Sequence, residues 1–308
     1  MPIYQEQSVR LPLCLKETKY VIVVVEMLHC NVFAENIKII TMSYTSQYLK
    51  KCQELIETVA AQEAQILRAA KLFSESILAG RMVHVFGSGH SRIMVEEMWP
   101  RYGSFPGFNP IVELSLTFHN LVVGANGQRQ AMFLENVTGL AAQILRNFDL
   151  SEVDTALVIS SSGCNVVPIE MAEILQKKGI KTVGIISKQH SEASTSKKQD
   201  GRKLQDFCEI VLDSGAPVGD AMIYVDGLET PVSPGSTVGS CMIINSIKAE
   251  LANMLTQAGH PPKVLTAGAV IGAEKATEIF QAAYDEHAHR IAKMYQKVGI
   301  ESYVSKEK

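Results

Sequence analysis

Short apolar runs that end in glycine, serine or asparagine, each followed by a segment with helical character, limit what this 308-residue chain can fold into. Residues 82–86 lead into the sequence GSGHS at 87–91, and residues 155–159 lead into SSSGCN at 160–165. Three more apolar runs have the length of strands: 110–114, 180–186 and 209–212. Uninterrupted apolar strands that alternate with helices are typical of a parallel sheet that is buried on both faces. The sequence therefore predicts an α/β fold in which helices cover both faces of a mainly parallel sheet.

The chain beyond residue 213 predicts a loop-rich segment followed by two helices. Residues 214–235 are rich in glycine, proline and aspartate, and they include a candidate strand or hairpin at 222–225. A helix is expected to begin near Ser236 and to end before Gly259, because two prolines follow closely. The last helix is expected over residues 273–297.

Residues 1–41 differ from the rest of the chain, since they have neither helix caps nor a long hydrophobic period. We expect them to be an atypical extension upstream of a native start at Met42; the alternative is a genuine extra strand at 21–25. The apolar run 20–25 is far shorter than a membrane span, and no small-residue cleavage site follows it. No interior linker divides two cores after Met42, so residues 42–300 are expected to form one domain.

Residues 46–79 contain neither proline nor glycine, and their apolar side chains recur at alternating spacings of four and three. The stripe, interrupted by Glu63, consists of Cys52, Ile56, Val59, Ile66, Ala70, Phe73 and Ile77. This period predicts one helix of about nine turns. Such a helix is too long to serve one small sheet alone, so we expect it to pack against its counterpart in a homodimer or a higher homo-oligomer.

Composition and charge argue against several classes of function. With 46% hydrophobic residues the chain has enough apolar material for a large core, and a net charge of −3 leaves no basic footprint for nucleic acid. The six cysteines are scattered without a C-x-x-C pair, which argues against a zinc site, a redox motif and a disulfide framework. We therefore expect a cytoplasmic protein with reduced thiols, without a metal or other cofactor and without a nucleic-acid or membrane partner.

The loops 87–91 and 160–165 both follow predicted strands and precede predicted helices. In an open parallel sheet, ligands bind beyond the carboxyl ends of the strands, where helix N-termini offer unpaired N–H groups and a positive dipole end. Such loops also serve as plain turns and caps, but two of them in the same register favour one phosphate-type anion site. Ser236 and Thr237 are either a third anion contact or a plain N-cap, and we favour the cap.

The second loop resembles the signature of SIS (sugar isomerase) domains. The sequence ALVISSSGCN at 156–165 is followed by a helix, a Lys-Lys-Gly turn and a strand at 182–187. The family form is Ser-x-Ser-Gly-x-Thr, then a helix, a Lys/Gly turn and a strand, and Asn165 stands where threonine is usual. The loop 87–91 matches too, and the resemblance covers about residues 44–260.

The resemblance implies a three-layer αβα sandwich with a five-stranded, flavodoxin-like sheet, a dimer, and a sugar phosphate held by the two serine-rich loops. It implies a phosphate-binding role for Ser88, Ser91, Ser160 and Ser162. The expected substrate-binding residues are Gly87, Ser88, Gly89, Ser91, Ser160, Ser161, Ser162, Gly163, Asn165, Ser236 and Thr237. The chain is most similar to the phosphosugar-binding branch of this family, to which phosphoheptose isomerases are related.

The sequence EMWPRY at 97–102 is similar to the Glu-Leu-x-Gly-Arg-Tyr segment of phosphoheptose isomerases, whose glutamate serves as base. Glu97 is therefore the candidate base for an aldose–ketose isomerisation, although Pro100 replaces the glycine. His90 is the candidate second acid–base group, and His190 is an alternative. His287 lies on an apolar helical seam and is expected to be a packed, hydrogen-bonded core histidine.

The expected function is binding of a phosphorylated sugar or amino sugar, with sugar-phosphate isomerisation as the expected reaction. The helical histidine of the isomerases has no clear equivalent in residues 236–255, which keeps a non-catalytic sugar-phosphate sensor as an alternative. A sugar-phosphate lyase or etherase would use the same loops and a glutamate. A dinucleotide-binding dehydrogenase is disfavoured, because Arg92 stands at the third glycine position of the G-x-G-x-x-G fingerprint.

Overall fold

A five-stranded parallel sheet lies at the centre of the structure, a computed structural model that describes residues 20–21, 40–117 and 127–295. The strands, in the order in which they lie side by side, are β4 (Phe108–Ile111), β3 (Val83–Gly87), β5 (Thr155–Ile159), β6 (Lys181–Ile186) and β7 (Ile210–Asp213). All neighbouring pairs in this sheet are parallel. Every residue of β3 and β5 is buried, and the two strands are apolar except for His84 and Thr155, as expected for parallel strands covered on both faces.

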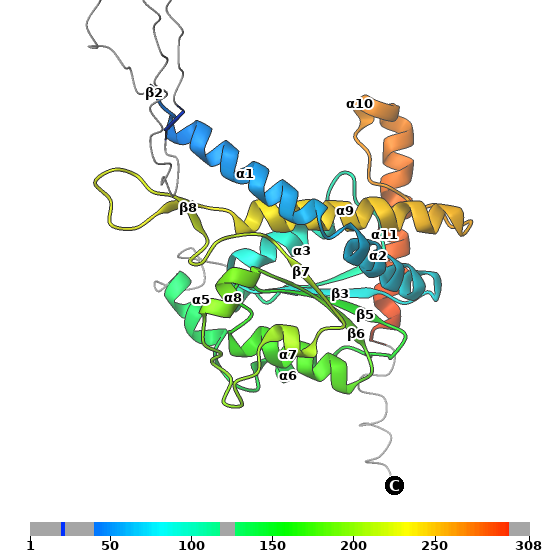
Figure 1. Ribbon diagram of the computed structural model, residues 1–308. Helices are drawn as coiled ribbons and strands as arrows, with labels where there is room; N and C mark the ends of the chain where they lie inside the picture. The colour runs from blue at the N-terminus through cyan, green and yellow to red at the C-terminus, as the bar shows by residue number, and fades with distance from the viewer. Residues whose placement is uncertain (1–19, 22–39, 118–126, 296–308) are drawn as a thin grey trace, which may run out of the picture.

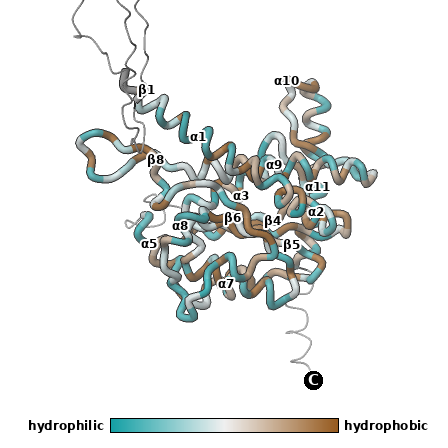
Figure 2. The backbone as a smooth tube through the Cα atoms, in the orientation of Figure 1, coloured by the Kyte–Doolittle hydropathy of each residue, from teal (hydrophilic) through white to brown (hydrophobic). Residues whose placement is uncertain are grey.

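Helices cover both faces of the sheet, so the predicted three-layer α/β architecture is confirmed (Figure 1). The helices on one face are α2 (Glu63–Leu78), α3 (Arg92–Met98) and α9 (Ser236–Gln257). Those on the other face are α6 (Leu140–Leu145) and α7 (Val166–Lys177). Each face has its own buried cluster, one around Phe73 and Trp99 and one around Phe86 and Phe207. Figure 2 shows that hydrophobic residues are concentrated along the strands between these layers.

The remaining elements connect or extend this framework. They are β1 (Tyr20–Val21), β2 (Ile40–Thr41), α1 (Tyr44–Ala60), η1 (Gly89–Ser91), α4 (Leu114–Thr117), α5 (Gln128–Leu134), α8 (Lys188–Ala193), η3 (Leu204–Phe207), β8 (Ala221–Ile223), β9 (Val232–Pro234), α10 (Gly268–Ile271) and α11 (Ala273–Lys293). β1 pairs antiparallel with β2, and β8 with β9. Most of the extension 1–41, including all but the first residue of the candidate strand 21–25, lies outside the described residues. Of the helices in the described ranges, none combines the length and the apolar character needed to cross a bilayer.

The single long helix expected over 46–79 is two helices, so that prediction was wrong. α1 ends and α2 begins around Gln62, whose backbone leaves the helical region at φ −105° and ψ 16°. The Gln62 side chain forms two hydrogen bonds with the edge strand β7: its Nε2 donates to the Asp213 carbonyl at 2.8 Å, and its Oε1 accepts from the Asp213 N–H at 2.7 Å. These bonds to the sheet edge compensate for the backbone hydrogen bonds that the helix loses at the break. The hydrophobic period of the sequence does not indicate them, because they are tertiary contacts.

Three element boundaries also differ from the sequence prediction. β4 lies at 108–111 instead of 110–114, and α4 already begins at Leu114. The helix after the loop 87–91, which the sequence predicts to extend to about Arg101, is α3 and ends at Met98. A residue before proline disfavours the helical conformation, and Trp99 is extended. The described part of the last helix ends at Lys293.

A buried polar cluster lies at the amino ends of β3 and β5, away from the loops that follow these strands. The Arg81 guanidinium donates to both carboxylate oxygens of Asp154, at 2.7 Å and 2.8 Å. His84 Nε2 lies 3.2 Å from the same carboxylate, and His84 Nδ1 lies 3.0 Å from the Asn109 amide nitrogen. Burial alone would raise the pKa of Asp154, but the bonds from His84 and Arg81 outweigh it and lower that pKa to about 2.

Candidate functional site

The strand order reverses between β3 and β5, which makes their carboxyl ends the topological switch point of the sheet. β3 lies between β4 and β5, so the connections that leave β3 and β5 diverge to opposite sides. The loops 87–91 and 160–165 therefore lie side by side. They border one cavity of about 360 Å³.

Most residues expected to bind substrate line this cavity. They are Ser88, Gly89, Ser91, Ser160, Ser161, Ser162, Asn165, Ser236 and Thr237. His90 and the alternative His190 line it as well. Gly87 and Gly163 lie in the same two loops and shape them: a Cβ on Gly87 would come within 2.5 Å of the Ser91 carbonyl oxygen, and Gly163 has φ +63°.

The loop 160–165 is folded by its own hydroxyl groups. Ser160 Oγ accepts a hydrogen bond from the Gly163 N–H at 3.3 Å, and Ser162 Oγ accepts one from the Cys164 N–H at 3.2 Å. Directly after the loop, α7 begins at Val166 and directs its positive dipole end to the cavity. Among the described residues, the buried hydroxyl of Ser161 has no hydrogen-bond partner. This loop therefore offers an anion both a dipole and an unused donor.

Glu135, at the C-terminal end of α5, is the carboxylate that the sequence did not indicate. It lines the cavity and joins the two loops, because Oε2 accepts from Ser88 Oγ at 2.9 Å and Oε1 accepts from Asn165 Nδ2 at 2.8 Å. Burial raises the pKa of Glu135, and the bonds and charge of Ser88, Lys197 and Asn165 offset only part of that rise. A raised pKa makes a carboxyl group better suited to act as both base and acid in proton transfer.

A further part of the cavity wall is built around Asp220, a loop residue with φ +68°. Its carboxylate accepts hydrogen bonds from the N–H groups of Gly235 and Ser236, at 3.1 Å and 2.7 Å, and from Ser236 Oγ at 2.7 Å. Gly235 occupies the N-cap position of α9. The expectation that Ser236 is the N-cap is thus corrected: a carboxylate distant in sequence caps this helix.

His190 lies on α8 and is held by the loop that precedes Asp220. Its Nδ1 accepts a hydrogen bond from the Gly219 N–H at 3.0 Å. An imidazole that accepts at Nδ1 carries its proton at Nε2. This ring therefore has a donor available for a ligand.

The candidate base Glu97 does not lie with these loops. Helix α3 starts directly after the loop 87–91, and at 1.5 Å per residue Glu97 is about 9 Å further along it than Ser91. Glu97 borders a different depression of about 600 Å³, with Tyr102 and Phe280. Within a single chain, Glu97 therefore does not line the cavity that the two loops border.

The partners of Glu97 hold its carboxylate in the ionised form. Its Oε1 accepts from Asn245 Nδ2 at 2.8 Å, and its Oε2 pairs with Arg101. Partial burial alone would raise the pKa of Glu97, but the bonds from Asn245 and Arg101 outweigh it and lower the pKa. This environment is typical of a structural ion pair.

His287 is a packed histidine, as its position on an apolar seam predicted, but within the described residues its buried Nδ1 has no hydrogen-bond partner. Its ring lies 5.2 Å from that of Trp99, centroid to centroid. Burial, followed by the charge of Arg290, lowers the pKa of His287. His287 lines neither the cavity between the loops 87–91 and 160–165 nor the depression at Glu97.

Comparison with known proteins identifies the family. The family model of the SIS domain matches residues 47–187. UPF0309 protein BH3325 of Halalkalibacterium halodurans is 32% identical over 235 residues, which cover 76% of this chain and 94% of that protein. The chain belongs to the UPF0309 family, and it contains a SIS domain. A second UPF0309 protein, lin2794 of Listeria innocua, is 32% identical over 247 residues, covering 80% of this chain and 96% of the relative.

The solved structures that are similar to this chain include a phosphoheptose isomerase and a protein solved with a phosphorylated sugar. A phosphoheptose isomerase from Francisella tularensis has 17% identity and a TM-score of 0.42, and the match covers 67% of this chain and 95% of that one. The NanR protein of Vibrio vulnificus, solved with ManNAc-6P, has 12% identity and a TM-score of 0.40, with 77% and 69% covered.

Proposed function

We propose that the cavity at the carboxyl ends of β3 and β5 binds one sugar phosphate. The observation that carries this proposal is the convergence of two hydroxyl-bearing loops and the N-terminus of α7 on a single cavity. Its volume of about 360 Å³ is at the lower end of ligand pockets, which suits a small phosphorylated sugar. Membership of a family with a SIS domain agrees with this ligand class.

The phosphate group is best accommodated by the loop 160–165. The N-terminus of α7 supplies N–H groups and a favourable dipole there, and Ser161 supplies the buried hydroxyl described above. The sugar then extends toward Glu135, His190 and Asp220, the polar side chains that border the rest of the cavity.

Aldose–ketose isomerisation is the reaction that this set of groups supports best. The Glu135 carboxylate would take the proton from the carbon next to the substrate carbonyl, while Nε2–H of His190 donates a proton to the carbonyl oxygen. The protonated Glu135 would then return its proton to the neighbouring carbon, and the imidazole would take the hydroxyl proton back. Proton transfer by positioned side chains of this kind accelerates reactions about 10²–10⁴-fold. In this proposal Glu135 takes the role of base that the sequence assigned to Glu97. His190 is the second acid–base group, and His90, the residue first expected in that role, is the alternative.

A thermal-shift screen with hexose, heptose and amino-sugar phosphates tests binding. The proposal expects stabilisation of the wild type by at least one of them, loss of that stabilisation in Ser161→Ala and Ser162→Ala, and its retention in Thr277→Ala. Thr277 is an exposed helical residue of α11 and serves as the matched loss of a hydroxyl. Equal stabilisation of all four proteins would contradict the proposed site.

Product analysis on each stabilising sugar phosphate tests the chemistry. Interconversion of aldose and ketose supports the isomerase, whereas a product that has lost a leaving group would identify a lyase or etherase instead. Binding without turnover would identify a sensor.

We further propose that residues 42–300 form the functional unit and that it acts as a homodimer in the cytoplasm. Large apolar side chains are exposed on α1 and near α11, including Leu49, Ile56 and Val270. These helices extend beyond the sheet and its covering layers (Figure 1). The cysteines in the described part of the chain are free, which fits a reducing compartment. Light scattering of the full chain tests the dimer, and a monomer at micromolar concentration would contradict it.

A further inference from the structure

Lys197 is linked to the cavity through one side chain. Its Nζ donates to Asn165 Oδ1 at 2.8 Å, and Asn165 Nδ2 donates to Glu135 Oε1 at 2.8 Å. The other Glu135 oxygen accepts from Ser88. A continuous row of hydrogen bonds therefore runs from an exposed cation to the carboxylate between the two loops.

The direction of every bond in this row follows from Lys197. An ammonium group has only donors, so the amide end that faces it must be the oxygen. The amide nitrogen of Asn165 then faces Glu135, and it can only donate, which favours the ionised form of that carboxylate. Without Lys197, the amide could turn and present its oxygen to Glu135.

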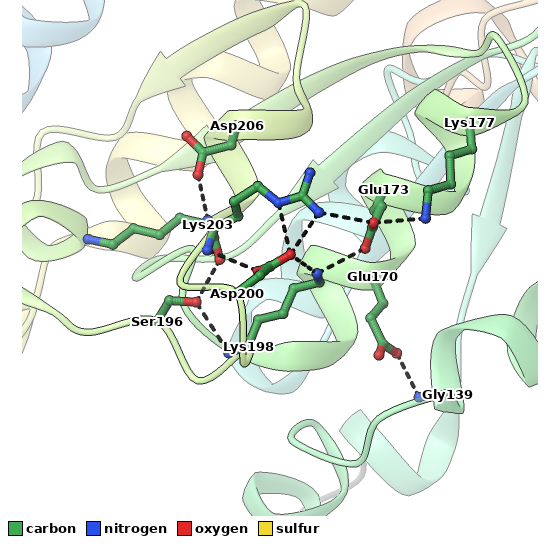
Figure 3. Close-up of polar contacts among 10 residues, drawn as sticks. Gly139, Glu170, Glu173, Lys177, Ser196, Lys198, Asp200, Lys203 and Asp206 are labelled. Atoms are coloured by element: carbon green, nitrogen blue, oxygen red, sulfur yellow. Dashed lines mark hydrogen bonds and ion pairs between the residues drawn. The ribbon is translucent and has the colours of Figure 1, made fainter.

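The segment that carries Lys197, residues 194–203, is called the strap here, and it is fastened to α7. Figure 3 shows Lys198 and Asp200 of the strap beside Glu173 of α7. Lys198 Nζ and Arg202 Nη2 each lie 3.3 Å from a Glu173 oxygen, and Arg202 Nη2 lies 2.7 Å from Asp200 Oδ2. Each exposed pair is weak alone, but these pairs share their charges in one network.

Two further contacts fix the position of the strap. The Arg202 guanidinium lies 4.5 Å from the centroid of the Phe207 ring. The Lys197 N–H donates to the Cys164 carbonyl at 2.9 Å, which ties the strap to the loop 160–165 itself. The backbone of Lys197 is thus held beside Asn165. This position restricts the Lys197 side chain to the neighbourhood of the Asn165 amide.

We propose that Lys197 is a positioning residue, which the strap holds in place to orient the Asn165 amide and, through it, the carboxylate of Glu135. The proposal rests on the proposed role of Glu135 as the acid–base group. Lys197 does not itself border the cavity, so it acts through Asn165 rather than on the ligand.

This role has a measurable electrostatic consequence. The positive charge of Lys197 lowers the pKa of Glu135, against the larger upward effect of burial. The other titratable side chains that border the same cavity are His90, His190 and Asp220, and the substitution of Lys197 replaces none of them. Because Lys197 is exposed, its removal should raise the pKa of Glu135 by on the order of half a unit.

Titration of the Glu135 carboxyl carbon by NMR in the full chain tests the proposal without any substrate. The signal is assigned by its loss in Glu135→Gln. In Lys197→Met the midpoint should rise by roughly half a unit, and Lys197→Arg should restore it to within about 0.2 units of the wild type, because a donor and a charge are kept. Lys178→Met removes an exposed charge at the other end of α7 and should leave the midpoint unchanged.

An unchanged midpoint in Lys197→Met, or an equal rise in Lys178→Met, would overturn the proposal. Calorimetric titration with inorganic phosphate separates positioning from direct ligand binding. Positioning expects phosphate affinity in Lys197→Met within about threefold of the wild type; a loss of tenfold or more would make Lys197 a phosphate ligand and overturn its positioning role. Since neither experiment needs turnover, their failure is distinguishable from a failure of the isomerase assignment.

Discussion

Ser88 Oγ donates a hydrogen bond of 2.9 Å to Glu135 Oε2, and this contact links the loop after β3 to the C-terminal end of α5. The two residues are distant in sequence, and they belong to different structural elements. Their contact places a half-buried carboxylate between two loops that are suited to an anion. The predicted behaviour of the site depends on this carboxylate.

Replacing Glu135 should stop turnover while binding remains. Glu135→Gln keeps the size of the side chain but removes the base, so the rate on the substrate found by screening should fall by about 100-fold or more. Stabilisation by the same sugar phosphate in the thermal-shift assay should persist. Glu96→Gln, which removes an exposed carboxylate paired with Arg92 on α3, is the matched control and should retain the wild-type rate.

The comparison of Glu135→Gln with Glu97→Gln decides between the two carboxylates. The geometry predicts the larger loss of kcat in Glu135→Gln. A loss confined to Glu97→Gln would show that a second copy of the chain brings Glu97 to the loops, and that the base is the residue indicated by the resemblance to phosphoheptose isomerases.

The pH dependence of the reaction should show the raised pKa of Glu135. Only the ionised carboxylate can act as base, so kcat/KM should fall as the pH drops through this pKa. Because burial raises the pKa, the fall should begin at a higher pH than for an exposed glutamate, whose pKa is about 4.3. Initial rates measured from pH 4 to pH 9 test this, and a rate that stays flat down to about pH 4.3 would contradict it.

The fold and the site differ in how far the sequence predicts them. The five strands and both loops were predictable, because buried parallel strands are predominantly apolar and the Gly-Ser loops directly follow two of them. Glu135 and Asp220 were not, since Glu135 ends the short helix α5 and Asp220 lies in a loop, and only tertiary contacts with Ser88 and Ser236 bring them together at the cavity. The interruption at Gln62 has the same origin, because its side chain is bonded to a strand some 150 residues later in the chain.

The cluster around Asp154 should make stability depend on acid pH. The pKa of this carboxyl falls from an ordinary 3.8 to about 2 in the folded chain, which corresponds to about 2 kcal/mol of stability. Since the folded pKa is depressed, this contribution is fully present above about pH 5 and is lost as the pH falls from there toward pH 2. Asp154→Asn should lower the free energy of unfolding at pH 7 by at least about 2 kcal/mol in a urea titration, because Arg81 loses its buried partner. Asp226→Asn, at an exposed position, should have almost no effect; equal losses would refute the assignment.

The junction of α1 and α2 should depend on Gln62. Gln62→Ala removes both hydrogen bonds to the Asp213 backbone and should lower the free energy of unfolding by about 1–3 kcal/mol. Gln65→Ala, one helical turn away and exposed, is the matched control and should stay within about 0.5 kcal/mol of the wild type. If the two variants were equally stable in urea, the bonds from Gln62 to Asp213 would not stabilise this junction.

The most direct test of the account is a crystal structure of the chain with a sugar phosphate that stabilises it. The account predicts phosphate oxygens within hydrogen-bond distance, about 2.6–3.2 Å, of the Ser161 or Ser162 hydroxyl, with the sugar carbons next to Glu135. A phosphate bound in the depression at Glu97, with the cavity between the two loops left without ligand, would contradict it.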